Sequence, residues 1–162
     1  MKTSIKTLLI IAIMAITAIG ATAQEVDIGG SLQYSLAPQS LKHNVGADII
    51  VARDLSHGFQ LRAIAEVNGL IPNGFDRYGR ATLGVAYSIA PLYVFIDMGA
   101  CLDPSDKRRF GYTADGGIGW HRRIGRGTLF TEAALTATHG TKWRNNVIVR
   151  AGYMFNIKRK QP

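Results

Sequence analysis

Apolar residues alternate with polar or small residues along most of the chain, and this period of two is the feature that most constrains the fold. The pattern is clear at 146–155, where apolar side chains occupy alternate positions and end in Tyr153 and Phe155, while Arg150 lies on the opposite face. Successive side chains of a strand point to opposite sides of its sheet. The pattern therefore predicts a β-strand with one apolar and one polar face.

Similar alternation predicts eight strands joined by short links, at 26–36, 42–53, 59–68, 78–90, 92–101, 109–121, 128–138 and 146–155. These segments are ten to thirteen residues long. Strands of soluble sheets usually have roughly five or six residues, whereas about nine to eleven cross a bilayer at a tilt. The sequence therefore predicts an all-β fold, an eight-stranded antiparallel up-and-down transmembrane β-barrel.

The N-terminal residues have the pattern of a secretory signal peptide. Lys2 and Lys6 precede an apolar run at 8–19, and 21–23 reads Ala-Thr-Ala, a small-residue cleavage signature. An uncleaved anchor is the alternative, but the run is shorter than the roughly 20 residues of a spanning helix. We expect a cleaved signal peptide at 1–23, a barrel at 24–157 and a basic periplasmic tail at 158–162.

The formal net charge of +8 falls to +6 if the two lysines of the signal peptide are removed. The remaining basic residues cluster in predicted turns, loops and the tail, at 107–109, 122–126 and 158–160. This distribution favours contact with anionic lipid head groups over nucleic acid. Cys101 is the only cysteine, so no internal disulfide is expected. No Cys/His metal spacing occurs, so no metal or cofactor is expected.

The orientation of the two faces decides between a membrane barrel and a soluble one. A soluble exported barrel of the lipocalin type would place apolar residues inside and bind a small apolar ligand. The polar faces here are instead rich in small residues and carry charges of both signs without lysine, which suits a narrow filled lumen better than a solvated exterior. We expect the apolar faces outward and this lumen charge network: Asp27, Asp48, Arg62, Glu66, Arg80, Asp97, Asp115, Glu132 and Arg150.

Antiparallel neighbours suggest particular partners inside the lumen. The predicted pairs are Arg62 with Asp48, Arg80 with Glu66, and Arg150 with Glu132 or Asp27. Six acids face three arginines, so not every acid can pair. Asp97 and Asp115, on neighbouring predicted strands, are expected to be the acids left hydrated.

Aromatic residues gather near the ends of the apolar faces. This placement is typical of the aromatic girdles at the two membrane–water interfaces. One predicted rim holds Phe59, Tyr87, Trp120, Tyr153 and Phe155, and the other holds Tyr34, Phe110 and Tyr112.

From Gln24 onward the chain resembles the small eight-stranded outer-membrane β-barrel proteins of Gram-negative bacteria, the OmpA transmembrane domain and OmpX among them. The closing strand carries the most specific part of this resemblance. The resemblance implies a monomer in the outer membrane, surrounded by its lipids. It also implies that the barrel-assembly machinery recognises an aromatic or apolar residue of the last strand, either Phe155 or Ile157.

The candidates for catalysis are few. His43 and His139 lie near predicted loops at one rim, and His57 and His121 lie near turns at the other. A hydrolase needs a nucleophile, a base and an orienting acid within mutual reach, and no serine stands beside His139. We therefore expect a non-enzymatic, structural or accessory barrel without an open pore. An outer-leaflet lipid-modifying enzyme is the alternative within the same fold.

Overall fold

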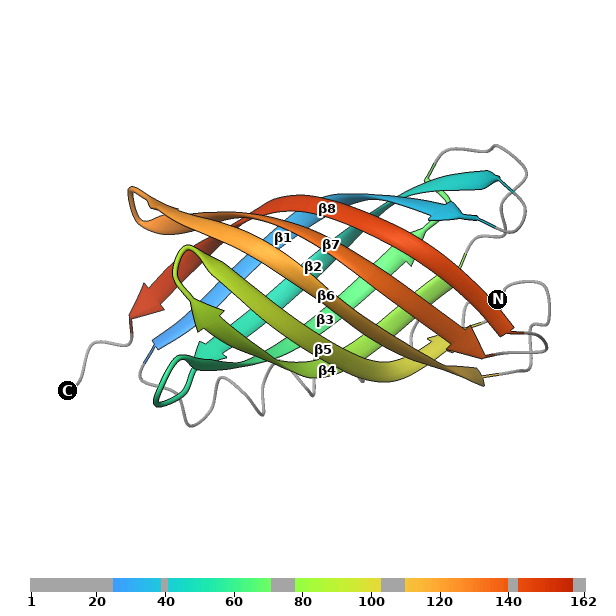
Figure 1. The fold of residues 1–162 in the computed structure, drawn as a ribbon. Helices are drawn as coiled ribbons and strands as arrows, with labels where there is room; N and C mark the ends of the chain where they lie inside the picture. The colour runs from blue at the N-terminus through green and yellow to red at the C-terminus, as the bar shows by residue number, and fades with distance from the viewer. Residues whose placement is uncertain (1–24, 39–40, 71–77, 103–109, 140–142, 159–162) are drawn as a thin grey trace.

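The structure is a computed structural model that describes residues 25–38, 41–70, 78–102, 110–139 and 143–158. Eight strands close into a barrel in the order of the chain (Figure 1). The strands are β1 (Glu25–Ala37), β2 (Lys42–Asp54), β3 (Phe59–Asn68), β4 (Tyr78–Ile89), β5 (Leu92–Leu102), β6 (Phe110–Ile124), β7 (Gly127–His139) and β8 (Trp143–Lys158). The predicted eight-stranded antiparallel up-and-down barrel is confirmed. In these parts of the chain no helix is long and apolar enough to cross a membrane.

Every strand is antiparallel to both of its neighbours, and the barrel closes where β1 pairs with β8. At this closure Leu32 of β1 stands opposite Ala151 of β8. Closure provides backbone partners on both sides of each strand, so the barrel presents no open sheet edge. A surface without open edges is the condition that a β structure must meet to lie in hydrocarbon.

The two ends of the barrel are distinguished by the strand ends that meet there. The turns 55–58, 90–91 and 125–126 lie at one end, together with the start of β1 and the end of β8; we call this end the turn rim (Figure 1, left). The opposite end, which we call the loop rim, is formed by the ends of β1, β3, β5 and β7 and by the starts of β2, β4, β6 and β8. Gly125 takes a φ of 62° in its two-residue turn, a conformation that glycine adopts without steric cost.

Side-chain exposure follows the alternation and gives the orientation of the faces. Outward-facing Leu32, Met98 and Leu135 expose 67 %, 60 % and 69 % of their surfaces, whereas inward-facing Arg80 and Arg150 each expose 1 %. The apolar residues of the alternating pattern therefore lie outside and the charged residues inside. This is the expected membrane-type orientation.

Six strands are longer than the alternation predicted, and β6 and β8 extend furthest. β6 continues to Ile124, which pairs with Gly127, and β8 begins at Trp143, which pairs with His139. Backbone pairing persists at these ends, although the side chains no longer alternate. Most of the loop predicted at 139–145 is therefore strand.

The predicted domain limits are tested only in part by the described residues. Lys158 pairs with Glu25, so β8 extends one residue into the predicted tail. The predicted signal peptide at 1–23 and the tail residues 159–162 lie outside the described residues, as does the basic cluster at 107–109.

Candidate functional site in the barrel lumen

Three arginines point into the lumen from three different strands: Arg62 from β3, Arg80 from β4 and Arg150 from β8. Each is almost completely buried, with at most 3 % of its surface exposed. A buried guanidinium requires anionic or hydrogen-bonding partners to offset the loss of its hydration. The lumen carboxylates provide these partners.

Arg62 makes a two-pronged ion pair across the barrel. Its Nη1 and Nη2 donate to Oε1 and Oε2 of Glu132 on β7 at 2.6 and 3.0 Å. Its Nε lies 3.2 Å from Oδ1 of Asp97 on β5, and its guanidinium stacks 4.4 Å from the Phe95 ring centre. The planar fork of arginine suits this two-pronged contact with a carboxylate.

Arg80 and Arg150 continue the contacts toward the loop rim. Arg80 lies 2.6 Å from Oε2 of Glu66 and donates to Oδ1 of Asp115 at 2.7 Å. Arg150 lies 3.4 Å from Oε2 of Glu132 and 3.8 Å from Oδ2 of Asp115. Seven side chains thus form one chain of alternating charge, the ion-pair chain, in this order: Asp97, Arg62, Glu132, Arg150, Asp115, Arg80 and Glu66.

The structure places two of the predicted partnerships at contact distance and one elsewhere. Arg80 lies against Glu66, and Arg150 lies against Glu132. The predicted partnership of Arg62 with Asp48 is wrong, because the register places Asp48 opposite Glu66 and Arg62 opposite Ala52. Asp48 instead accepts a hydrogen bond of 2.7 Å from the Ser31 hydroxyl.

The expectation that Asp97 and Asp115 would be left without an arginine is also wrong. Asp97 contacts Arg62, and Asp115 contacts Arg80 and Arg150. The expectation assumed one acid for each arginine, whereas a guanidinium with five N–H donors can serve two carboxylates.

Asp27 lies apart from the ion-pair chain. It lines the lumen at the turn rim, where its Oδ1 accepts a hydrogen bond of 2.9 Å from the Asn156 side chain. Asp27, which was predicted as an alternative partner of Arg150, therefore lies at the end of the barrel and not in its middle.

An apolar layer, which the alternation did not predict, occupies the lumen on the turn-rim side. It consists of two buried clusters: Ile50, Ala52, Ile64, Phe130 and Met154, and Ala86, Tyr93, Phe95 and Ala134. These residues share strand faces with polar residues, so they read as breaks in the alternation. Such breaks occur on several strands, and this repetition is the feature of the sequence that could have predicted the layer.

Tyr93 joins the apolar layer to the ion-pair chain. Its hydroxyl donates to Oε1 of Glu132 at 2.6 Å, the same oxygen that Arg62 contacts. The ring of His121 lies 5.4 Å from the ring of Tyr93, between centres. Tyr93 therefore has an apolar environment for its ring and a charged acceptor for its hydroxyl, the arrangement that a buried tyrosine favours.

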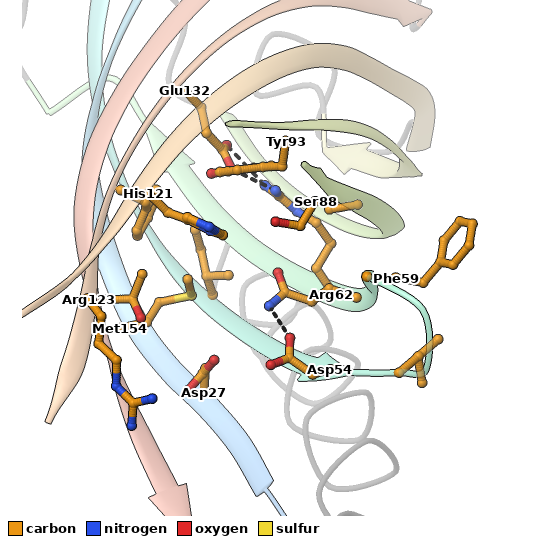
Figure 2. Close-up of a pocket in the computed structure, with 17 residues that line it drawn as sticks. Asp27, Asp54, Phe59, Arg62, Ser88, Tyr93, His121, Arg123, Glu132 and Met154 are labelled. Carbon is orange, nitrogen blue, oxygen red and sulfur yellow. Dashed lines mark hydrogen bonds and ion pairs between the residues drawn. The ribbon is translucent and has the colours of Figure 1, made fainter. Parts of the chain in front are cut away.

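A cavity of about 420 Å³ lies in the turn-rim end of the lumen (Figure 2). We call it the turn-rim cavity. Its inner part is bounded by Arg62, Tyr93 and Glu132, and Asp54 and His121 are nearer the rim in the same view. Its lining includes side chains from all eight strands, since Asp27 comes from β1, Ile50 from β2, Gln60 from β3, Ser88 from β4, Tyr93 from β5, His121 from β6, Phe130 from β7 and Met154 from β8.

Neutral polar side chains fill the lumen toward the loop rim. Gln33 donates to Oδ1 of Asn68 at 2.8 Å, Asn68 donates to Glu66, and Asn44 accepts from the backbone N–H of Gly69 at 2.8 Å. The alternation puts these positions on the polar faces of their strands, but it does not indicate what they contact. They extend the hydrogen-bonded lumen from the ion-pair chain to the loop rim.

The four histidines are divided between the two ends of the barrel. His43 and His139 lie in β2 and β7 beside the loop rim, whereas His57 and His121 lie at the turn rim. Among the described side chains, no group of three or more His, Cys, Asp or Glu residues could hold a metal ion. Cys101 is buried on the inward face of β5.

The predicted girdle aromatics lie on the outward face, and some form pairs. Phe59 packs against Tyr87 across β3 and β4, and Tyr153 meets Phe155 along β8, each with ring centres 4.9 Å apart. The Tyr153 hydroxyl also donates to the Ile124 carbonyl at 2.7 Å. Trp120 and Tyr153 are half-buried, whereas the others are exposed: Tyr34, Phe59, Tyr87, Phe110, Tyr112 and Phe155.

No family model and no curated protein sequence matches the chain. Among solved structures, a designed transmembrane β-barrel matches with a TM-score of 0.51 at 14 % identity, covering 84 % of this chain and 98 % of that one. The attachment invasion locus protein Ail of Yersinia pestis, solved with the heparin analogue sucrose octasulfate, matches with a TM-score of 0.53 at 8 % identity, covering 84 % and 100 %. The N-terminal β-barrel domain of Pseudomonas aeruginosa OprF has a TM-score of 0.49 at 14 % identity, covering 82 % and 98 %.

At these identities the matches establish a shared fold. The chain has the closed eight-stranded architecture of the small outer-membrane β-barrels.

Replacing Arg62 should destabilise the barrel more than replacing Arg150, whose ion-pair contacts are longer. Arg62→Met removes both guanidinium donors to Glu132 and the arginine that contacts Asp97, so we expect a loss of about 3–5 kcal/mol, because buried charges lose their partner. Urea-induced unfolding in lipid vesicles, followed by tryptophan fluorescence, measures this loss. Arg150→Met is the matched control with longer contacts, and an equal or larger loss for it would contradict this ranking.

Gly119 should tolerate no side chain, because a Cβ there would meet the Tyr93 ring directly. Gly119→Ala must displace the ring and its bond to Glu132, so we expect destabilisation of about 1–3 kcal/mol. Gly116 lies on the outward face of the same strand, and the nearest atom to an added Cβ is 4.0 Å away. Gly116→Ala should stay within about 0.5 kcal/mol of the parent. Equal unfolding midpoints for the two variants would argue against the Tyr93 contact.

Proposed function

We propose that the protein is an integral β-barrel of the Gram-negative outer membrane with a structural or accessory role. The observation that carries this proposal is the band of exposed apolar side chains around a barrel without open edges. A soluble protein rarely exposes so continuous an apolar surface. Hydrocarbon is the environment in which this surface costs least.

The proposal includes a closed lumen that does not conduct. Eight strands enclose an interior just wide enough to be filled by side chains. Here the ion-pair chain and the apolar layer occupy successive levels of that interior. A hydrated ion would have to separate buried charged partners and then cross apolar side chains.

The outward positions of the last strand support recognition by the barrel-assembly machinery. Phe155 and Ile157 both face outward at alternate positions near the end of β8 and expose 59 % and 52 % of their surfaces. The other partners we propose are the surrounding lipids. Since both edges of every strand are paired within the chain, we propose a monomer.

We propose no nucleic-acid partner and no catalytic reaction. Arg122, Arg123 and Arg126 gather at one turn instead of forming a stripe along the barrel, a position that suits lipid phosphates. The division of the histidines between two rims gives a lipid-modifying reaction no obvious centre. The outward orientation of the apolar faces disfavours the soluble ligand-binding alternative.

Membrane integration predicts resistance to extraction and to detergent. Because its backbone hydrogen bonds are all internal, the folded barrel should stay with membranes in an alkaline carbonate wash. It should also run differently on a dodecyl sulfate gel before and after boiling. Both measurements apply to the full chain expressed in a Gram-negative host. Release of the folded protein by the wash would refute membrane integration, whereas stepwise conductance in planar bilayers would refute only the closed lumen.

An arginine in the middle of the outward face should be costly only if that face contacts lipid. Ile96 lies near the middle of β5 and faces outward. Ile96→Arg should therefore destabilise the barrel in vesicles by about 2–4 kcal/mol, whereas Ile124→Arg at the turn rim should cost about 0–1 kcal/mol. Urea unfolding of both variants in vesicles measures the difference. Equal costs at the two positions would mean that the outward face does not lie in hydrocarbon.

A further inference from the structure

The turn-rim cavity has a fixed inner end. Arg62 and Tyr93 both donate to Glu132, with three hydrogen bonds between 2.6 and 3.0 Å. This group already satisfies its own charges, and it closes the lumen beyond the cavity. A molecule that enters from the turn rim therefore meets a floor and cannot pass through.

The sides of the cavity are apolar and aromatic. Ile50, Ala86 and Phe130 are buried side chains of the apolar layer that face the cavity, and Met154 lines it from β8. The rings of Tyr93 and His121 also line it, with centres 5.4 Å apart. Aromatic faces and edges at this spacing can pack against a third ring.

Hydrogen-bond acceptors surround the opening. Oδ1 of Asp54 accepts a hydrogen bond of 2.9 Å from the Gln60 side chain. Because a carboxylate can accept several hydrogen bonds, Asp54 can also accept one from a ligand. Ser88 and Asp27 contribute further oxygens to the lining. The lining of this opening includes two carboxylates, Asp27 and Asp54, and the guanidinium of Arg123, so it offers acceptors to a neutral donor.

We propose that the turn-rim cavity binds small aromatic molecules that carry a hydrogen-bond donor, the class of indoles and phenols. The volume of about 420 Å³ is within the range of small-molecule sites. The closed floor excludes long acyl chains, and the ring-lined sides favour a flat apolar body. This binding function goes beyond the proposed structural role and does not depend on whether the lumen conducts ions.

Methionine methyl resonances can locate such a ligand, because the described part of the chain has one methionine on each side of the barrel wall. Met154 lines the cavity, whereas Met98 faces outward with 60 % of its surface exposed. An indole ring placed in the cavity shifts the Met154 methyl signal through its ring current. An indole dissolved in the surrounding detergent shifts the Met98 signal.

The experiment titrates indole into the refolded, methyl-¹³C-methionine-labelled protein in detergent micelles. The two signals are assigned with Met154→Leu and Met98→Leu. We expect a saturable shift at Met154 and at most a small linear shift at Met98. The related probe 1-methylindole has no N–H donor, so it should bind several-fold more weakly, since a donor that pairs with a partly buried acceptor contributes about 1 kcal/mol.

A bulky side chain at the opening provides the matched control. Thr128 lines the cavity, whereas Thr131 lies on the outward face of the same strand. Thr128→Trp should abolish the saturable shift, and Thr131→Trp should leave it unchanged. If Thr128→Trp does not fold, judged by gel mobility before boiling, Ser88→Trp replaces it.

Three results would overturn the proposal. These are no shift at Met154, parallel linear shifts at both methionines, or a saturable shift that survives Thr128→Trp or its replacement. Equal affinity for indole and 1-methylindole would remove the donor from the proposal and overturn the stated ligand class. None of these results bears on membrane integration, which the carbonate wash tests separately.

Discussion

The lumen of this barrel depends on the sharing of three guanidinium groups among four carboxylates. Charges in a space that narrow must be paired or hydrated, and each arginine here contacts two acids in place of one. The strongest of these contacts, from Arg62 to Glu132, connects β3 with β7 across the interior. The pairing therefore holds the barrel wall together in a direction in which the backbone ladder makes no bonds. It also explains how a lumen with more acids than arginines can be almost completely buried.

The interior changes in character along the barrel axis. Neutral amides lie toward the loop rim, ion pairs lie in the middle, and apolar rings and aliphatic side chains lie on the side of the turn rim. Tyr93 joins the last two levels, because its ring packs with Phe95 and its hydroxyl reaches Glu132. The turn-rim cavity is the space that remains open within the apolar level. Its closed floor and its ring-lined sides are consequences of the same packing.

The architecture could be predicted from the sequence because alternation is a local signal repeated on eight strands. The limits of β3 agree with the prediction at both ends. β8 is longer than predicted, because its pairing with β7 continues through Arg144 and Asn145, two successive polar residues that do not show the alternation of a strand. The identity of the inward charges followed from the same alternation. Their partners did not, since Arg62 reaches over to Asp97 and Glu132 instead of Asp48 on the next strand. Contacts across a lumen depend on barrel curvature and side-chain length, which a strand pattern does not contain. The apolar layer was not predicted for a related reason. In the sequence, Ile50 and Phe130 each look like an isolated apolar residue on a polar face, and only the closed barrel brings them together.

The ion-pair chain has a consequence for the order in which the barrel can assemble. All seven of its members belong to β3 through β8. The buried lumen residues of β1 are the uncharged Ser31, Gln33 and Ser35, and its one lumen carboxylate, Asp27, lies at the turn rim. A curled sheet of the last six strands can therefore neutralise its own arginines before the first two strands arrive. Joining β1 to β8 then places Gln33 opposite Arg150 and separates none of the ion pairs in this chain. The seam between the first and last strands is the place where this cylinder can be opened or sealed at the least electrostatic cost.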